Sequence, residues 1–498
     1  MIFRPQKPAL LWDTWLYNDH GQFHLFFLRR SSADQPWDMI GHAVGDDLVH
    51  WKEVEPIQTR GPEGAWDCGP TLTGMVFRHD GKYWMSFGSL TGKVERIGLM
   101  YSDDLYHWTK HPGNPLLVAT GPHYETKSRP GFQFVDWRDA CCFWREDAQV
   151  YEALVCARQA QPQGNATGAC IARLRSKDLV SWEFLPPLAV AGPGFYNCEV
   201  PDYFEIDGTH YLLFSCAGDG GASPCRRDTP SRIRPFGTWY QRADRFEGPY
   251  TMPADPLLLG SGQGRWDCYV GRTINLDGRR LLYHHMGPAA PAWAAPKWVE
   301  PGPDRTLALK YWPGLAKLRS DVLVRDFSRA RLDDPLLQAA GRWNRAADHT
   351  RLEGQSNSVP SAVALADPVR DFELLCTIDA TRAESASVLF DLAGDPLTGM
   401  ALSLRRDSGS AEIGPVQMTL APAISLGMLD CCKTPLVLSQ SLKLRLLIRA
   451  EYMECYLNDQ WIFSTILGNR PVPGRIGFAV CGGSALFAGL EIHSLRPL

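Results

Sequence analysis

Two patterns of hydrophobic and polar positions follow one another along the chain. In the first part, short apolar runs recur, as in residues 23–27 (FHLFF), 83–87 (YWMSF) and 211–214 (YLLF). Turn residues precede each run, namely residues 18–21 (NDHG) in the first case and an Asp-Gly pair in the other two. Asp-Gly between alternating apolar residues is among the strongest short-range signals for a β-hairpin. The pattern therefore predicts a succession of antiparallel hairpins.

A second repeated unit marks predicted corners between strands. Residues 45–51 (GDDLVHW), 102–108 (SDDLYHW) and 176–182 (SKDLVSW) share the sequence Asp-Leu-x-x-Trp, and each follows an apolar run typical of a strand. Hairpins and corners that recur about every 55 to 75 residues are typical of the four-stranded blades of a β-propeller. The alternative is a set of unrelated hairpins. We predict five blades, which start near residues 10, 66, 135, 198 and 266.

From about residue 340 the corner motif disappears and longer alternating strands replace it. Examples are residues 372–378 (FELLCTI), 442–448 (LKLRLLI) and 476–480 (IGFAV). Period-2 strands with turn residues between them, over about 160 residues, predict a β-sandwich. We therefore predict an all-β protein with a five-bladed β-propeller over residues 1–335 and a β-sandwich over residues 336–498. Two domains agree with a length of 498 residues, which is too long for one core.

Composition narrows the choice of partners. The net charge is −4 and no basic run occurs, which argues against nucleic acid or an anionic membrane. The chain has no apolar signal segment at its start, so we expect a soluble, cytoplasmic protein. Its 14 cysteines never take a zinc-binding spacing, and we expect reduced thiols and no metal site. The content of 17 Trp, 16 Tyr and 21 Phe suits stacking on sugar rings, although such residues also fill β-cores.

Three carboxylates take equivalent places at the starts of predicted blades. Asp13 precedes the first hairpin, Asp139 follows Arg138 in the third blade, and Glu199 opens the fourth. Because the first strand of each blade lines the central funnel, we expect these acids to converge. Glycoside hydrolysis needs such a set, with a nucleophile or base, an acid of raised pKa and a group that holds the sugar. The alternative is that the acids cap strands and pair with arginines, with Arg138 as the partner of Asp139.

The motifs around these acids resemble those of glycoside hydrolase family 32, the β-fructosidases such as invertases, levanases and inulinases. Residues 41–51 are similar to the family's first-blade corner, Arg138-Asp139 to its Arg-Asp-Pro motif, and residues 199–202 (EVPD) to its Glu-Cys-Pro-Asp motif. The resemblance covers nearly the whole chain.

This resemblance implies a role for each acid. Asp13 is the expected nucleophile and Glu199 the expected acid and base. Asp139 is expected to bind ring hydroxyls and to stabilise the transition state, with Arg138 beside it. The implied activity is that of a retaining, exo-type β-fructofuranosidase, which acts on sucrose or fructo-oligosaccharides and needs no metal or cofactor.

Several positions depart from the family's motifs. Residues 11–16 (LWDTWL) have neither the Asn residues nor the Pro of Trp-Met-Asn-Asp-Pro-Asn-Gly, and Asp67 adds a fourth acid where Ser-Gly-Ser is expected. Asp19 is a rival nucleophile, which we reject because it falls in the hairpin turn. His284 and His285 end the fifth blade where tryptophan is expected. Adjacent strand residues face opposite sides, so at most one histidine can reach the funnel, and we favour a surface or core role for both.

The predicted substrate-binding set comprises Asp67, Arg138 and four tryptophans at blade starts, whose alternative role is propeller core. The tryptophans are Trp12, Trp15, Trp66 and Trp266.

Two other functions remain open on the sequence. One is a related furanosidase that resembles the arabinanase and xylosidase propellers and inverts the anomeric centre. In that case the Asp13 and Glu199 carboxyls lie roughly 6.5–9.5 Å apart, against roughly 5–5.5 Å in a retaining enzyme. The other is a carbohydrate-binding propeller that has lost catalysis. The sequence does not decide whether the protein is a homo-oligomer.

Overall fold

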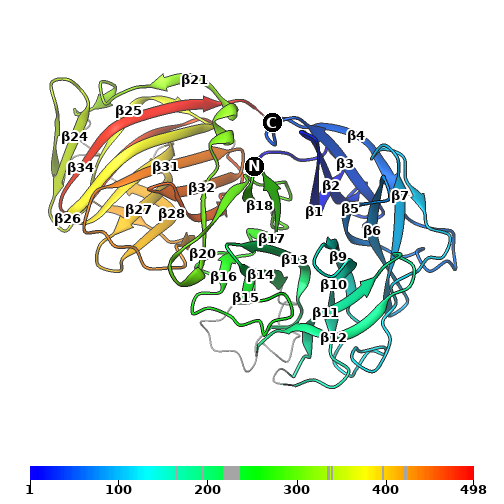
Figure 1. Cartoon of the computed structure of the whole chain (residues 1–498). Helices are drawn as coiled ribbons and strands as arrows, with labels where there is room; N and C mark the ends of the chain where they lie inside the picture. Colours follow the sequence, from blue (N-terminus) through cyan, green and yellow to red (C-terminus); the bar gives the residue numbers. More distant parts are fainter. Residues whose placement is uncertain are drawn as a thin grey trace. The chain divides into compact units, whose positions relative to one another are not determined.

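The computed structural model describes residues 1–163, 166–192, 195–216, 236–333, 337, 340–394, 397–419, 423–470 and 472–497. Its chain divides into two compact units (Figure 1). The N-terminal unit consists of Ile2–Leu259 and Cys268–Ala308, and the C-terminal unit of Met1, Gly260–Asp267 and Leu309–Leu498. None of the helices in the described ranges is long and apolar enough to cross a membrane.

Four antiparallel sheets of four strands, each in chain order, make up most of the N-terminal unit. Consecutive up-and-down sheets of this kind are the blades of a β-propeller, so the predicted propeller arrangement is confirmed for these four. The sheets are β1 (Leu10–Asp19), β2 (Gln22–Arg30), β3 (Met39–Gly45) and β4 (Lys52–Gln58); β5 (Thr71–His79), β6 (Lys82–Thr91), β7 (Val94–Ser102) and β8 (Thr109–Lys110); β9 (Trp137–Arg145), β10 (Val150–Arg158), β11 (Ala169–Ser176) and β12 (Glu183–Val190); and β13 (Glu199–Ile206), β14 (Thr209–Cys216), β15 (Gly237–Ala243) and β16 (Leu257–Leu259).

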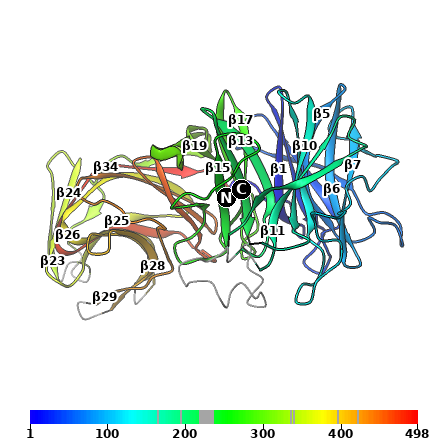
Figure 2. The ribbon, with the colours of Figure 1, turned by 60° about the horizontal axis from the view of Figure 1, so that its bottom comes forward.

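A further antiparallel ladder follows the fourth sheet. It contains β17 (Cys268–Leu276), β18 (Arg279–Met286) and β19 (Lys297–Pro301). The first strands of successive sheets contact one another in order from β1 to β17, and β17 in turn contacts β1. Figure 1 shows β1, β5, β9, β13 and β17 around a common centre, and Figure 2 shows the strand axes of this unit roughly aligned with one another. The first strands therefore line one central region, as the repeats predict.

The hairpin turns form where the Asp-Gly pairs predict them. Asp80-Gly81, Asp207-Gly208 and Asp277-Gly278 join the first two strands of their sheets, and both residues of each pair have positive φ, from 47° to 78°. Two consecutive residues of positive φ are the requirement of a type I′ turn, whose twist matches that of the flanking strands. Glycine meets this requirement without steric cost.

The Asp-Leu-x-x-Trp corners join the third and fourth strands of the first three sheets. In the second sheet, Oδ1 of Asp104 accepts hydrogen bonds of 2.8 Å from the backbone N–H groups of Tyr106 and His107. Leu105 is buried, and its carbonyl accepts a 2.9 Å hydrogen bond from the indole N–H of Trp108. Asp178 and Trp182 repeat these contacts in the third sheet. The corner is therefore an Asx-type turn, and the indole hydrogen bond of its tryptophan stabilises it.

The C-terminal unit contains a large β-sheet built on two 22-residue strands, β26 (Phe372–Ala393) and β34 (Gly474–Leu495), which pair with each other. The three runs predicted as long strands lie in β26, β31 and β34, so these predictions are confirmed. Their inward positions, such as Phe372, Leu446 and Phe478, are fully buried in one apolar core.

The remaining elements after β19 are η1 (Pro303–Arg305), β20 (Leu307–Tyr311), η2 (Pro313–Leu318), β21 (Arg319–Val324), β22 (Ala330–Arg331), β23 (Gly341–Arg345), β24 (Arg351–Ser356), β25 (Ser361–Val369), β27 (Thr398–Arg405), β28 (Ser410–Thr419), β29 (Ala423–Leu426), β30 (Asp430–Cys431), β31 (Leu442–Arg449), β32 (Tyr452–Leu457) and β33 (Gln460–Ile466). Strand β21 already pairs with β34. Residues 309–333, which the sequence assigned to the propeller, thus pack with the C-terminal unit.

Candidate active site

A β-bulge interrupts the first strand of each sheet around the centre of the N-terminal unit. The pairing register breaks between Leu11 and Thr14, Leu72 and Met75, Arg138 and Cys141, Glu199 and Asp202, and Tyr269 and Arg272. A bulge inserts extra residues and turns their side chains away from the regular alternation. Asp13 and Asp139 lie within bulges, and Glu199 directly precedes one. A β-bulge at the same point of each repeat therefore orients the three predicted acids.

The backbone at three of these bulges is strained. Asp139, Val200 and Val270 have φ values of 62°, 47° and 52°. Residues with a Cβ rarely adopt positive φ, and β-branched valine least of all. Each such residue costs of the order of 1–3 kcal/mol and persists only where the surroundings hold it in place. The strain falls where the acids are positioned, as is typical of functional sites.

Asp13 is almost buried and has a partner on each carboxylate oxygen. The hydroxyl of Thr73, from the bulge of β5, donates to Oδ2. Nε2 of His285 on β18 lies 3.1 Å from Oδ1. The ring of Trp12 packs against that of His285, with 4.4 Å between the ring centroids. Three neighbouring strands therefore fix the orientation of this carboxylate.

Glu199 receives two donors and keeps one-fifth of its side chain exposed. Nη2 of Arg138 donates to Oε1 over 2.5 Å, and the hydroxyl of Tyr269 donates to Oε2. Burial raises the pKa of Glu199 above its ordinary value, and the negative charge of Asp13 adds to the rise. The Arg138 cation and the Tyr269 hydrogen bond oppose this shift, but burial prevails. A carboxyl group of this kind suits general acid catalysis.

Asp139 is the most deeply buried of the three acids, at 5 % exposure. Its Oδ2 accepts a 3.1 Å hydrogen bond from the N–H of Val200 and lies 3.4 Å from Nε of Arg138. Burial raises the pKa of Asp139 well above its ordinary value; Arg138 opposes the shift, and the charges of Asp13 and Glu199 increase it. The acids are thus close enough for the charge of one to shift the pKa of another.

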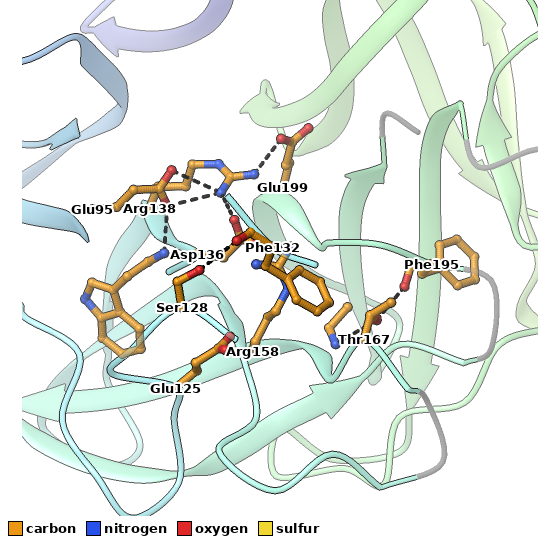
Figure 3. Close-up of polar contacts among 12 residues, drawn as sticks. Glu95, Glu125, Ser128, Phe132, Asp136, Arg138, Arg158, Thr167, Phe195 and Glu199 are labelled. Atoms are coloured by element: carbon orange, nitrogen blue, oxygen red, sulfur yellow. Dashed lines mark hydrogen bonds and ion pairs between the residues drawn. The ribbon is translucent and has the colours of Figure 1, made fainter. Parts of the chain in front are cut away.

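Arg138 links two of these acids to a deeper ionic cluster. Its Nη1 lies 2.6 Å from Oδ1 of Asp136 and 3.1 Å from Oε2 of Glu95, while Nη2 reaches Glu199. Figure 3 shows the guanidinium between these three carboxylates. Asp136 also pairs with buried Arg158 over 2.5 Å. The arginine pairing considered as an alternative to convergence therefore exists together with it.

Comparison with known proteins identifies the family. The model of the N-terminal domain of glycosyl hydrolases family 32 matches residues 14–287, more than half of the chain. The chain belongs to glycoside hydrolase family 32. The match includes Asp139 and Glu199 and begins directly after Asp13.

Individual relatives of this family 32 protein are distant. The chain is 26 % identical over 191 residues to the sucrose:sucrose 1-fructosyltransferase of Festuca arundinacea, which covers 36 % of this chain and 27 % of the relative. It is 28 % identical over 225 residues to the sucrose-6-phosphate hydrolase of Escherichia coli. That match covers 42 % of this chain and 40 % of the relative. The chain thus spans well under two-thirds of the length of these relatives.

Among solved structures, the exo-inulinase of Aspergillus awamori superposes with a TM-score of 0.69 at 15 % identity, over 99 % of this chain and 97 % of that one. At this identity the likeness establishes a shared fold.

The predicted substrate-binding residues of the family 32 protein take different places. Trp12 and Arg138 lie beside the acids, as described above. Trp15 is 1 % exposed and packs on Phe26, so no face of its ring is free for a sugar, which argues against its predicted stacking role. Trp66 packs on Phe87.

The other two predicted positions have structural partners or lie elsewhere. Asp67 is buried and pairs with Lys110 over 2.5 Å, so its carboxylate is held by a cation outside the cluster of acids. Trp266 belongs to the C-terminal unit. Asp202, which resembles a motif acid, accepts hydrogen bonds from the N–H and hydroxyl of Thr273 and so ties β13 to β17.

Several residues of the site were not found from the sequence. Thr73, Glu95 and Tyr269 carry no local signal, because they meet Asp13, Arg138 and Glu199 respectively only through the packing of neighbouring sheets. His285 did carry a local signal, because it replaces an expected tryptophan. We favoured a surface or core role for it from the sequence, and its contact with Asp13 was therefore not predicted. Within the ranges that the structure describes, no group of three or more His, Cys, Asp or Glu side chains could hold a metal ion.

Proposed function

We propose that this chain is a retaining, exo-type β-fructofuranosidase that acts on sucrose or short fructo-oligosaccharides. The observation that carries the proposal is the convergence of Asp13, Asp139 and Glu199 from the first strands of three separate sheets, each with its own donors. Membership of family 32 supports a glycoside hydrolase. The names of the relatives, which refer to sucrose and inulin, support a fructoside as the substrate.

In this proposal the two catalytic carboxyl groups act in sequence. Asp13 attacks the anomeric carbon of the fructosyl unit and forms a covalent ester, while Glu199 gives its proton to the leaving oxygen. Glu199 then removes a proton from water, which attacks the anomeric carbon and releases Asp13 and fructose. The raised pKa of Glu199 supports the first role. Esterification neutralises Asp13 and removes a negative charge that raises the pKa of Glu199, so Glu199 stays ionised after it has given up its proton and is available as the base in the second step.

Asp139 and Arg138 serve the substrate in this scheme. The buried Asp139 is suited to accept hydrogen bonds from ring hydroxyls, and Arg138 places a positive charge beside both Asp139 and Glu199. Trp12 supplies an aromatic face at the edge of the site. We further propose that β17–β19 belong to a fifth blade, that the C-terminal unit is a β-sandwich that begins near Leu309, and that the protein works in the cytoplasm.

Product analysis tests the proposal. The purified protein is incubated with sucrose, inulin-type and levan-type oligosaccharides and an aryl arabinofuranoside, and NMR identifies the sugar released and the anomer formed first. Fructose released first as the β-anomer is expected. Arabinose alone would indicate the related furanosidase, inversion would exclude the double displacement, and no turnover of any sugar would indicate a binding protein.

A matched pair of variants assigns the acid. Glu199→Gln is expected to lower kcat on sucrose by roughly 100-fold or more, because general acid catalysis contributes about 10²–10⁴-fold. Glu205→Gln alters an exposed glutamate on the same strand and is expected to keep wild-type activity. Equal activity of the two variants would remove Glu199 from the mechanism.

A further inference from the structure

We propose that His285 is a positively charged positioning residue that holds the carboxylate of Asp13. The inference rests on the proposed function in so far as Asp13 is the nucleophile. It goes beyond that function because it assigns a charge and a task to a residue at which this chain departs from its family's motif.

The hydrogen-bond partners of His285 determine its charge. The ring is completely buried. Its Nε2 lies 3.1 Å from Oδ1 of Asp13, and its Nδ1 lies 2.8 Å from the backbone carbonyl oxygen of Met286. The carbonyl oxygen is an acceptor, and Asp13 is one in the ionised form that a nucleophile requires. A neutral imidazole has one N–H and one lone pair, so either tautomer would turn its lone pair toward an oxygen, whereas the imidazolium form donates to both.

The adjacent histidine provides an internal contrast. Nε2 of His284 lies 3.0 Å from Nζ of Lys297, which can only donate, and its Nδ1 lies 3.1 Å from the carbonyl oxygen of His285. One nitrogen therefore accepts and the other donates, as a neutral ring requires. Burial and the charge of Lys297 lower the pKa of His284 well below its ordinary value. The two histidines thus face opposite sides of β18 and differ in charge, because His284 is neutral and His285 is a cation.

The other groups that face His285 are compatible with a cation. From β1, Trp12 packs its ring at 4.4 Å between centroids, a distance at which an aromatic face stabilises positive charge. From β17, Tyr269 meets the ring edge-on at 5.9 Å between centroids, and its hydroxyl is directed to Glu199. Asp13 is the acid in direct contact, and the cation Lys297 lies beyond His284.

The imidazolium has a specific task at this position. The charge of Asp13 contributes to the raised pKa of Asp139 and of Glu199, so three acids share one region. His285 supplies a compensating charge on Oδ1, while Thr73 binds Oδ2. The nucleophile is thereby kept ionised and its carboxylate plane is fixed, with lone pairs of both oxygens still open to the substrate.

Nitrogen NMR of the full chain, labelled at histidine, tests the charge directly. Near neutral pH, wild type is expected to show a buried histidine with both ring nitrogens protonated. In Asp13→Asn the same histidine is expected to lose one proton, because its carboxylate partner is gone. A wild-type spectrum in which every buried histidine has one bare nitrogen would overturn the proposal. This readout does not depend on turnover, so it separates a failure of the histidine assignment from a failure of the proposed function.

Kinetics test the task. His285→Gln can donate to Asp13 but carries no charge, and it is expected to lower kcat/KM on sucrose roughly 10- to 100-fold, as loss of a charged hydrogen bond does. Loss of the cation is also expected to move the acid limb of the pH profile of kcat/KM upward by roughly one to three units. His285→Asn provides a second, smaller neutral replacement. An acid limb that stays in place in whichever variant folds would contradict the proposal.

A control variant separates charge from packing. His42→Gln alters another buried histidine of the same unit, which lies in β3 and stacks on Phe26. It is expected to keep the wild-type pH profile even if it lowers stability. An equal shift of the acid limb in His42→Gln would overturn the specific role of His285.

Discussion

Removal of the Arg138 guanidinium offers the sharpest test of the ionic cluster beneath the acids. Arg138→Met keeps much of the side-chain volume and removes the charge. Asp136 retains its pair with Arg158, and Glu199 retains the Tyr269 hydroxyl. Glu95, which is 1 % exposed, retains the N–H of Trp137 but loses its guanidinium. The variant therefore removes the cation beside Glu95, Asp139 and Glu199, and Glu95 is the most deeply buried of these carboxylates.

The expected loss is large, because removal of one partner of a buried ion pair costs about 3–5 kcal/mol. Equilibrium urea unfolding followed by tryptophan fluorescence at about pH 9, where Glu95 is ionised in the wild type, measures it. The double variant with Glu95→Gln is expected to recover about 2–3 kcal/mol, as coupled neighbours do. Arg175→Met breaks an exposed pair with Glu183 and is expected to cost at most about 1 kcal/mol.

The stability difference between Arg138→Met and wild type is expected to depend on pH. Burial already raises the pKa of Glu95, and Arg138 opposes the rise, so removal of Arg138 raises that pKa further. An acid whose folded-state pKa is raised destabilises the protein above that pKa, and the penalty fades as pH falls and the group takes up a proton. The pKa of Glu95 is about 7 in the wild type and higher in the variant, so the difference between Arg138→Met and wild type is expected to shrink from about pH 9 to pH 7. A cost below about 1 kcal/mol, or one that is the same at both pH values, would refute the reasoning.

Further measurements address single residues. The raised pKa of Glu199 predicts that kcat/KM on sucrose falls as pH rises through that pKa, because the proton donor is lost, and Glu199→Gln should abolish this limb. Trp15→Ala is expected to cost about 3–5 kcal/mol of stability because its ring is in the core, whereas Trp12→Ala should mainly lower kcat/KM; the reverse outcome would exchange their roles. Val270→Gly relieves a positive φ and should not lower stability by more than about 1 kcal/mol, which differential unfolding in urea can check.

The elements of the N-terminal unit could be predicted because their signals are local. An Asp-Gly pair specifies a turn through the φ values of its own two residues, and an Asp-Leu-x-x-Trp corner satisfies its own backbone groups with its own side chains. Such signals need no knowledge of neighbouring sheets. Residues 309–335 carry no comparable signal. The assignment of residues 309–333 to the C-terminal unit follows from the pairing of β21 with β34, about 170 residues later in the sequence, which a local pattern cannot reveal.

The acids and the pairing of Arg138 with Asp139 could be predicted, whereas the other partners of the acids could not. Asp13, Asp139 and Glu199 recur at the same point of the repeat, so their convergence follows from the symmetry of the blades. Their donors come from different positions in other sheets.

The bulges explain why the partners escape pattern analysis. Strict alternation along a strand assigns each side chain to one face, and a bulge breaks that alternation at the point where the acids lie. A residue beside a bulge can therefore reach across to the next sheet, as Thr73 does to Asp13 and the N–H of Val200 does to Asp139. His285, on the strand β18 that pairs with β17, is likewise a partner that the strand pattern does not reveal. Its register opposite Tyr269 placed it at the centre, but only the proximity of Asp13 makes it a cation rather than another buried histidine. The chemistry of this site thus depends on departures from the repeat that builds it.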